Sequence, residues 1–241
     1  MKFLLIVFFS FFASVCSSTV NLATDHWPPF YSDKLKGGGI LAEIAKEAFK
    51  EVGEELKINY LPWKRAEQLS AEGKYDGLFG CWFSEKRAKV FNFPKPIYKS
   101  QTFLFKYGDK KFNYNELKDL KGLTVGVMRG YQYSKGFDKA GFFKKEAVNK
   151  HTQLFSKLKL GRIDLFVASK VVAFYNLKKE MPKDYKNYKT LNPPIASADL
   201  YIGFSKKVKR NKLLVELFNS GLSKIKKNGK YNKILVRHGL K

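Results

Sequence analysis

The chain of 241 residues contains few cysteines and histidines, and it lacks the short motifs that mark common catalytic centres. It has two cysteines and three histidines that are far apart in the sequence. It has no paired-cysteine or His-Glu-x-x-His metal spacing, no phosphate-binding glycine loop and no Gly-x-Ser-x-Gly turn. We therefore predict no metal site, no cofactor and no catalytic residue.

The first eighteen residues have the pattern of a secretory signal peptide. Lys2 gives a positive start, the apolar run "FLLIVFFSFFA" follows, and the small residues of "SVCSS" offer cleavage after Ser17 or Ser18. The apolar run is shorter than the roughly 20 residues that span a bilayer, and no later segment is apolar enough to cross one. We therefore predict removal of residues 1–18 and export of a soluble mature protein.

Removal of the signal peptide would leave Cys81 as the single cysteine. An exported protein without an intramolecular disulfide depends on its hydrophobic core for stability. Hydrophobic residues make up 44% of the chain, which is enough to form such a core. Because Cys81 stands between Gly80 and Trp82 at the end of an apolar stretch, we interpret it as a packed small residue rather than a nucleophile.

Acidic residues are scarce relative to basic ones. The chain has 21 Asp and Glu against 46 Lys and Arg, which gives a formal net charge of +25. The basic residues are scattered along the chain and the protein is expected to be exported, so we predict no nucleic-acid partner. Two interpretations stay open: a solvated surface adapted to an anionic environment, or an electric field that attracts anionic ligands or membrane surfaces.

Hydrophobic periodicity predicts strands that alternate with helices along the mature chain. Residues 37–53 place one apolar face on a helix, formed by Ile40, Leu41, Ile44, Ala45, Ala48, Phe49 and Val52. The predicted strands are 20–25, 56–61, 75–82, 100–107, 123–128, 163–168 and 198–207, and the other predicted helices are 63–73, 152–161, 169–181, 211–229 and 231–239.

This alternation is typical of an α/β architecture with mostly parallel sheets. It occurs in two sets, and no low-complexity linker separates them. We therefore predict two lobes joined by extended strands and hinged over a cleft. The first lobe would contain residues 19–101 and 201–241, and the second would contain residues 102–200.

Several aromatic residues lie just after predicted strands, in the segments that follow them. Trp27 lies in "DHWPPFY", which begins at Asp25 and is stiffened by two prolines. Trp63 and Arg65 lie in "LPWKRA", and Tyr131 lies in the turn "RGYQ". Ligands bind at strand ends in α/β sheets, and aromatic walls hold small molecules. These residues are candidate ligand contacts; the alternative for the two tryptophans is packing at the edge of the core.

Arg87 follows "SEK", a turn or helix start where backbone N–H groups are free. A guanidinium beside such groups forms a strong carboxylate site. From composition alone, however, an arginine in so basic a chain is more simply interpreted as a solvated surface residue.

The order of these motifs resembles the extracellular solute-binding proteins of family 3, the periplasmic amino-acid receptors of ABC importers. "WPPF" matches the family's early aromatic motif, and "EGKYDGLFGCWFSEKRAKVFNFPKPIY" looks like its "G-x-x-D … T-x-x-R … F-x-x-P-x-Y" block. "LGRIDLFVAS" resembles its second-lobe segment, and "IKKNGKYNKI" resembles its C-terminal signature. The resemblance covers essentially the whole mature chain and implies a two-lobed, type II periplasmic-binding-protein-like fold.

The resemblance also implies roles for particular residues. Arg87 falls on the arginine that holds the carboxylate of the ligand, and Trp27 and Trp63 fall on the aromatic walls of the site. The turn from Gly130 through Tyr131 to Gln132 falls on the second-lobe turn whose backbone also meets the carboxylate. On this basis Arg87 is predicted to be a ligand residue.

The sequence departs from the family at positions that concern the ligand. Ser169 stands where the family has the acid that pairs with an α-ammonium group, and Trp82 replaces a small residue beside the carboxylate site. Leu41 replaces an Asp near the start of the first helix. A buried ammonium without a counter-charge is costly, so we predict a ligand with a carboxylate or other anionic group that need not be a standard α-amino acid. Asp199 and Glu43 are alternative acids, and the sequence does not place either in the cleft.

The resemblance predicts a monomeric periplasmic protein that closes on a small solute and is recognised by an ABC permease in the inner membrane. Two alternatives remain open. One is an enzyme like cyclohexadienyl dehydratase on the same fold, which would need an acid or base in the cleft, and Ser169 argues against it. The other is a sensor or surface protein without a role in transport.

Overall fold

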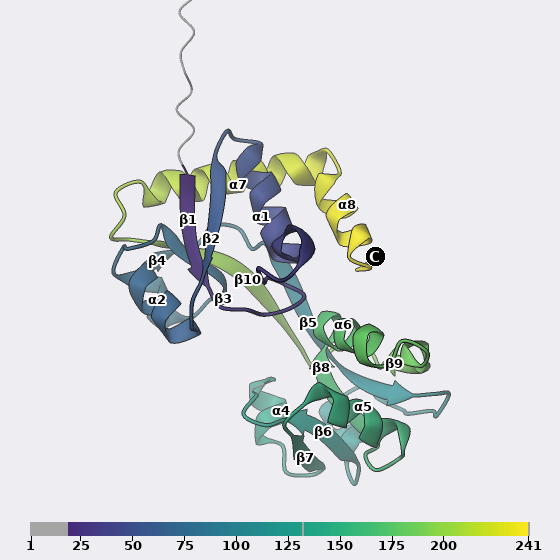
Figure 1. Cartoon of the computed structure of the whole chain (residues 1–241). Coiled ribbons are helices and arrows are strands. Elements are labelled where there is room, and N and C mark those ends of the chain that lie inside the picture. Colours follow the sequence, from purple (N-terminus) through teal and green to yellow (C-terminus); the bar gives the residue numbers. More distant parts are fainter. Residues whose placement is uncertain (1–18, 132, 241) are drawn as a thin grey trace, which may run out of the picture.

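The computed structural model describes residues 19–131 and 133–240 (Figure 1). The predicted signal peptide and Gln132 lie outside the described residues. The described chain forms two lobes, one above the other in Figure 1, with two long strands running between them. The predicted α/β fold with two lobes is confirmed.

The first lobe, the upper one in Figure 1, is built from both ends of the described chain. A short 3₁₀ helix (Lys36–Gly38) precedes its first α-helix. Its strands are β1 (Thr19–Thr24), β2 (Glu55–Tyr60), β3 (Gly77–Trp82) and β4 (Phe91–Asn92), and its helices are α1 (Ile40–Lys50), α2 (Trp63–Ala71), α3 (Glu85–Ala88), α7 (Asn211–Lys227) and α8 (Lys230–Arg237).

The second lobe is formed by the middle of the chain and is the lower one in Figure 1. Two short 3₁₀ helices (Leu117–Leu120 and Tyr185–Asn187) belong to it. Its strands are β6 (Thr124–Met128), β7 (Lys144–Val148), β8 (Leu165–Ser169) and β9 (Tyr188–Thr190), and its helices are α4 (Lys135–Lys139), α5 (His151–Lys159) and α6 (Lys170–Glu180).

Two strands connect the lobes: β5 (Tyr98–Tyr107) and β10 (Ala196–Ser205). They pair antiparallel with each other, so the strands form one sheet in the order β2-β1-β3-β10-β5-β8-β6-β7. Within each lobe the neighbouring strands are parallel, as β1 is with β2 and β3, and β6 is with β7 and β8. The predicted crossing by extended strands is therefore found. The predicted division between residues 101 and 102 and between 200 and 201 falls inside these two strands and stays a prediction.

Helix α1 has the apolar face that the sequence predicts, and that face is buried in the core of the first lobe. The helix begins at Ile40 rather than at Gly37, because Gly37 to Gly39 have φ angles of 71°, 89° and 96°, which lie outside the helical region. It ends at Lys50, so Val52 follows the helix. Helix α7 approaches α1 closely at Gly221, where an added Cβ would lie 1.9 Å from the Ala48 carbonyl oxygen.

The core of the second lobe is rich in aromatic side chains. Phe105 of β5 stacks on Phe166 of β8 with ring centroids 4.7 Å apart, and both are fully buried. The hydroxyl of Tyr188 donates to the carbonyl of Phe155 at 3.0 Å. Strand β7 and helix α4 were not expected from the sequence. Both are only five residues long, and segments this short have too little periodicity to be recognised.

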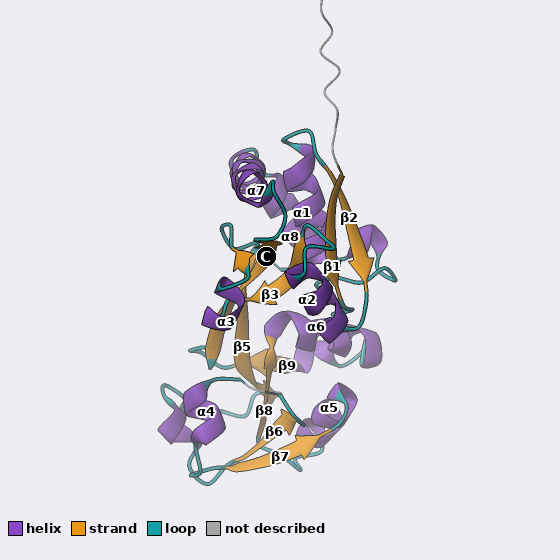
Figure 2. Ribbon diagram, turned by 90° about the vertical axis from the view of Figure 1, so that its left-hand side faces the viewer, coloured by secondary structure: helices purple, strands orange, loops and turns teal. Residues whose placement is uncertain are grey.

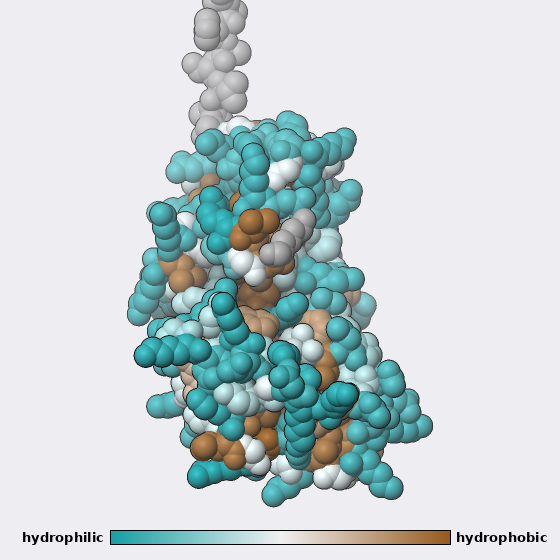
Figure 3. All heavy atoms as spheres, turned by 90° about the vertical axis from the view of Figure 1, so that its right-hand side faces the viewer, coloured by the Kyte–Doolittle hydropathy of each residue, from teal (hydrophilic) through white to brown (hydrophobic). Residues whose placement is uncertain are grey.

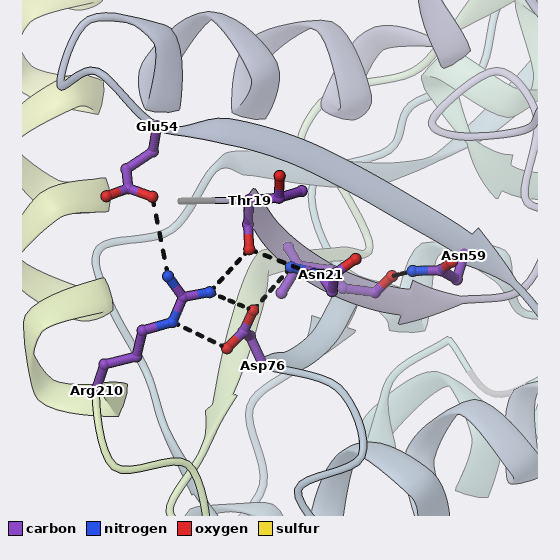
Figure 4. A network of polar contacts seen from close by, with 7 residues as sticks. Thr19, Asn21, Glu54, Asn59, Asp76 and Arg210 are labelled. Atoms are coloured by element: carbon purple, nitrogen blue, oxygen red, sulfur yellow. Dashed lines mark hydrogen bonds and ion pairs between the residues drawn. The ribbon is translucent and has the colours of Figure 1, made fainter. Parts of the chain in front are cut away.

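A polar network around Arg210 joins distant segments of the first lobe (Figure 4). The Arg210 guanidinium donates to both carboxylate oxygens of Asp76, at 3.2 Å from Nε and 2.8 Å from Nη2. It also donates to the carbonyl of Thr19 and lies 3.9 Å from a carboxylate oxygen of Glu54. Asp76 in turn accepts from the backbone N–H of Asn21. Arg210 thus connects the start of β1, the loop before β3 and the start of α7.

Within residues 19–131 and 133–240, no helix is both long and apolar enough to cross a membrane.

Candidate ligand-binding site

A hollow of about 400 Å³ lies between the lobes. Figure 2 shows this side of the molecule, with α2 and α3 of the first lobe above α4 of the second. Most of the lining comes from the ends of β1 and β3 and from the helices that follow β2 and β3, whereas two residues come from the turn after β6. The lining residues are Asp25, Trp27, Tyr31, Trp63, Gly80, Cys81, Trp82, Arg87, Gly130 and Tyr131.

Arg87 is positioned by contacts on three sides. Its backbone N–H donates to the hydroxyl of Ser84, which caps the N-terminus of α3. Its side chain donates from Nε to Glu67 at 2.8 Å and from Nη1 to the carbonyl of Trp82 at 3.1 Å. The guanidinium also lies 5.4 Å from the centroid of the Trp63 ring, a cation–π distance. In the described part of the chain, Nη2 has no hydrogen-bond partner.

Aromatic rings form the walls of the hollow. The rings of Trp27 and Trp82 meet edge to face, with centroids 5.9 Å apart. Trp82 remains 49% exposed, and Tyr131 on the opposite lobe is 54% exposed. Such exposure is unusual for large aromatic side chains that only complete a core. These rings present apolar area to whatever fills the hollow.

Asp25 follows the last residue of β1 and adds a carboxylate to the same hollow. Burial raises the pKa of this carboxyl, against the smaller lowering effects of its own backbone N–H and of His26. Across the described residues, no cationic group lies within ion-pair distance of Asp25. A partly buried carboxylate without a counter-ion is unfavourable.

Cys81 is among the residues that line the hollow, and it is almost completely buried. Burial raises the pKa of its thiol to about 12. The thiol is therefore protonated at neutral pH, and a nucleophile needs the thiolate. This agrees with the prediction that Cys81 is a packed small residue.

A smaller hollow of about 110 Å³ continues from the first toward the crossing strands and shares Trp27, Trp82 and Tyr131 with it. Ser169 lines this inner hollow, and its hydroxyl lies 3.3 Å from that of Ser100 on β5. His151 also lines it, and burial lowers the pKa of the His151 ring. Among the described lining residues, no Asp, Glu, Lys or Arg enters the inner hollow.

The structure brings together most of the predicted site residues, but not all of them. Arg65 is exposed on α2 and lines neither hollow. Gln132 lies outside the described residues. Neither alternative acid is in the site: Glu43 pairs with Arg237 and His238, and Asp199 lines neither hollow.

Larger hollows lie away from these residues. One of about 540 Å³ lies along β2, and two others are larger still. One of about 740 Å³ is on the opposite side of the crossing strands, between α6 and the C-terminal segment, and Figure 3 shows that side. The other, of about 870 Å³, lies between α1 and α8. Lysines line both, namely Lys36, Lys170, Lys178 and Lys179 in the first and Lys36, Lys46, Lys230 and Lys233 in the second. Neither contains the aromatic walls or Arg87, so volume alone does not identify the site.

Glu67 and Tyr31 were missed by the sequence analysis. Glu67 is one of many charges on an amphipathic helix, and its pairing with Arg87 depends on how α2 and α3 pack. Tyr31 is buried, and its hydroxyl donates to the carbonyl of Gly80 at 3.2 Å. Its place in "WPPFY", four residues after the predicted wall residue Trp27, is the signal that could have suggested it. In the part of the chain that the structure describes, no cluster of three metal-ligating side chains occurs.

The two lobes joined by crossing strands, with a hollow lined from both of them, define a solute-binding protein. The model of the bacterial extracellular solute-binding proteins of family 3 matches residues 20–241, and the chain belongs to this family. Its resemblance to this family is confirmed.

Individual relatives agree with the family assignment. The chain is 26% identical to the arginine-binding periplasmic protein of Mannheimia haemolytica over 238 residues, which cover 97% of this chain and 96% of that protein. It is also 26% identical to the ABC transporter arginine-binding protein 1 of Escherichia coli K12, covering 95% and 94% of the two chains. Among solved structures, the second substrate-binding domain of Lactococcus lactis GlnP in an open conformation matches with a TM-score of 0.74 and 25% identity, covering 91% of this chain and 94% of that one.

Proposed function

We propose that this protein is the binding receptor of an ABC importer and that the site between its lobes binds a small solute through a carboxylate. The observation that supports this most directly is the state of Arg87, which lines the hollow with Nη2 unpartnered among the described residues. Charge-assisted hydrogen bonds from a guanidinium to a carboxylate are strong and directional. Two of the relatives are named for binding arginine, which is itself a solute with a carboxylate.

Lobe closure is the mechanism that this site supports. The first lobe contributes Arg87, Asp25 and the tryptophans, and the second contributes Gly130 and the exposed ring of Tyr131. A ligand that touches both sets of residues stabilises the closed arrangement over the open one. In the proposed transport role, the closed form is what the permease recognises.

The remaining parts of the proposal concern the setting of the protein. It acts in the periplasm as a monomer, without a cofactor, and it releases its solute unchanged. Binding without turnover is proposed because the thiol of Cys81 is buried and protonated and Ser169 stands in place of an acid. Asp25 and His151 are titratable groups that do line the two hollows, and the turnover assay below tests whether they act on a substrate.

A thermal-shift screen of amino acids, keto acids and dicarboxylates on residues 19–241 tests the proposal. Ligand at about 100 times its dissociation constant is expected to raise the melting temperature by about 5 to 10 °C. The Arg87→Ala variant is expected to lose this shift, because the carboxylate loses its guanidinium. Arg162→Ala, which removes an exposed arginine of the second lobe, serves as the matched control and is expected to keep it.

Native mass spectrometry of the same samples adds the stoichiometry and the oligomeric state. Equal shifts in wild type and Arg87→Ala for every compound would contradict a carboxylate site at Arg87. Turnover of prephenate or arogenate by the wild-type protein would contradict the proposal that it is not an enzyme.

A further inference from the structure

The hollow of about 740 Å³ behind the crossing strands, called the rear hollow from here on, has no part in the proposed transport role. It lies on the side of the molecule shown in Figure 3, away from the cleft. The first lobe lines it with the 3₁₀ helix at Lys36 and with Gly239 and Leu240 after α8, and the second lobe lines it with α6. Its volume is typical of a small-molecule site.

The charged side chains that line the rear hollow are basic: Lys36, Lys170, Lys178 and Lys179. Among its described lining residues there is no Asp or Glu. Lys179 pairs with Glu180 at 3.7 Å, but both side chains are exposed, so this pair contributes little. In the described part of the chain, no acid lies within ion-pair distance of the other three lysines. The rear hollow therefore offers positive charge that the protein itself does not neutralise.

The second-lobe lysines are arranged along one face of α6. Lys170, Phe174 and Lys178 follow one another at intervals of four residues, so their side chains lie on the same side of the helix. The two lysines are about 12 Å apart along the helix axis, and the half-buried ring of Phe174 lies between them. Tyr98 at the start of β5 adds a second ring to the lining. This arrangement fits an apolar body that carries negative charges at its ends.

The lobes are close together at the rear hollow and apart at the cleft. An added Cβ at Gly239 of the first lobe would lie 3.3 Å from Nζ of Lys178 on α6. Val171 of α6 also packs into the hydrophobic cluster of the first lobe. In the cleft, by contrast, the rings of Trp82 and Tyr131 are 49% and 54% exposed.

Strands β5 and β10 run between the cleft and the rear hollow. A rotation about these strands that narrows the cleft must widen the rear hollow, because the two lie on opposite sides of the axis. An anion that contacts both Lys36 and α6 holds the rear of the lobes together and thus favours the open cleft. Without an anion, the uncompensated lysines of the two lobes repel one another, which favours closure.

We propose that the rear hollow binds an organic anion with two or more negative charges on an apolar body, and that this anion opposes closure of the cleft. The excess of positive charge on the chain, +25, attracts such anions to the protein. The coupling is reciprocal, so a solute in the cleft weakens the anion by the same factor. The opposition to closure rests on the lobe closure of the proposed function, whereas the binding of the anion does not.

Isothermal titration calorimetry with naphthalene-2,6-disulfonate on residues 19–241 tests the binding. Wild type is expected to bind one disulfonate per chain, and the double variant Lys170→Gln/Lys178→Gln is expected to bind it about tenfold more weakly. Lys183→Gln/Lys186→Gln is the control, because it has the same net charge and changes two exposed lysines outside the rear hollow. Its affinity for the disulfonate is expected to equal that of wild type.

A second titration tests the opposition to closure. It uses the compound that stabilises wild type most in the thermal-shift screen, with and without saturating naphthalene-2,6-disulfonate. The disulfonate is expected to weaken this compound about fivefold in wild type and in the control. In Lys170→Gln/Lys178→Gln, the same concentration of disulfonate is expected to have little effect.

The outcomes separate the anion site from the proposed function. Absence of disulfonate binding, or equal binding by the two double variants, overturns the anion site. Loss of disulfonate binding in Arg87→Ala places the probe in the cleft and also overturns it. Disulfonate binding that leaves the cleft compound unchanged refutes the opposition to closure. If no compound of the screen binds, the proposed function fails, and the first titration still decides the anion site. Melting temperatures show that each variant is folded.

Discussion

The two lobes contribute unequally to the site. The first lobe supplies the charged groups of the outer hollow, Asp25 and Arg87, whereas the second supplies a glycine and the ring of Tyr131. The first lobe is fastened by ion pairs between distant segments, such as that of Arg210 with Asp76 and those of Lys230 with Glu47 and Glu51. In the second lobe, aromatic rings pack among aliphatic side chains in the core, as Phe105 does on Phe166, and ion pairs such as that of Lys189 with Asp109 also join distant segments.

This difference suggests an order of events in binding. A solute can make its ionic contacts on the first lobe while the lobes are apart, because those groups lie on one body. The second lobe then adds aromatic and backbone contacts when it closes. In this proposed order, the lobe that supplies the charged contacts is distinct from the lobe that closes over the solute.

The largest expected effect comes from removing the Arg210 network of the first lobe. Arg210→Met leaves the nearly buried carboxylate of Asp76 without its main cation and is expected to lower the free energy of unfolding by about 3 kcal/mol. Urea unfolding followed by circular dichroism measures the loss. The same change at Arg162, an exposed residue of the second lobe, is expected to cost less than about 0.5 kcal/mol. Equal losses for both variants would show that the network does not stabilise the first lobe.

A smaller effect is expected from the second-lobe side of the site. Tyr131→Ala removes a ring that is 54% exposed, so the folded state loses little, but the closed complex loses an aromatic contact. Ligand affinity is expected to fall by about tenfold, mainly through faster dissociation. Stopped-flow fluorescence, with the site tryptophans as probes, measures the two rate constants. Phe142→Ala removes another exposed ring of this lobe outside both hollows and is the control. A changed association rate alone would contradict the proposed order of binding.

The smallest effect concerns Asp25 in the ligand-free protein. Because burial raises its pKa, the folded protein binds this proton more tightly than the unfolded chain does. The stability contributed by the protonated form is therefore lost as the pH rises through the raised pKa. Asp25→Asn removes this titration and is expected to melt at a higher temperature than wild type at neutral pH, with the difference vanishing at acidic pH. Thermal melts from pH 3 to pH 8 measure the difference. A variant that melts below wild type at neutral pH would indicate that Asp25 has a stabilising partner.

Much of the fold and part of the site could be predicted because they depend on local patterns. The apolar face of α1 follows from a helical repeat, and its predicted core residues are buried except Val52, which lies past the end of the helix. The positions of Trp27 and Trp63, shortly after β1 and β2, follow from the alternation of strands and helices. The short elements β7 and α4 were not predicted, because a segment of five residues shows little hydrophobic periodicity.

The sequence by itself determined the α/β class, the two lobes, the family and the excess of positive charge, because these depend on residue order and composition. Only the tertiary structure decided the electrostatics of the site. In the structure, Arg87 pairs with Glu67, which lies twenty positions earlier in the chain. Asp25 lines the hollow without a counter-ion among the described residues, and the Arg65 side chain is exposed to solvent. Charge compensation depends on distances of a few ångströms between side chains of different elements, and those distances are fixed only when the helices pack.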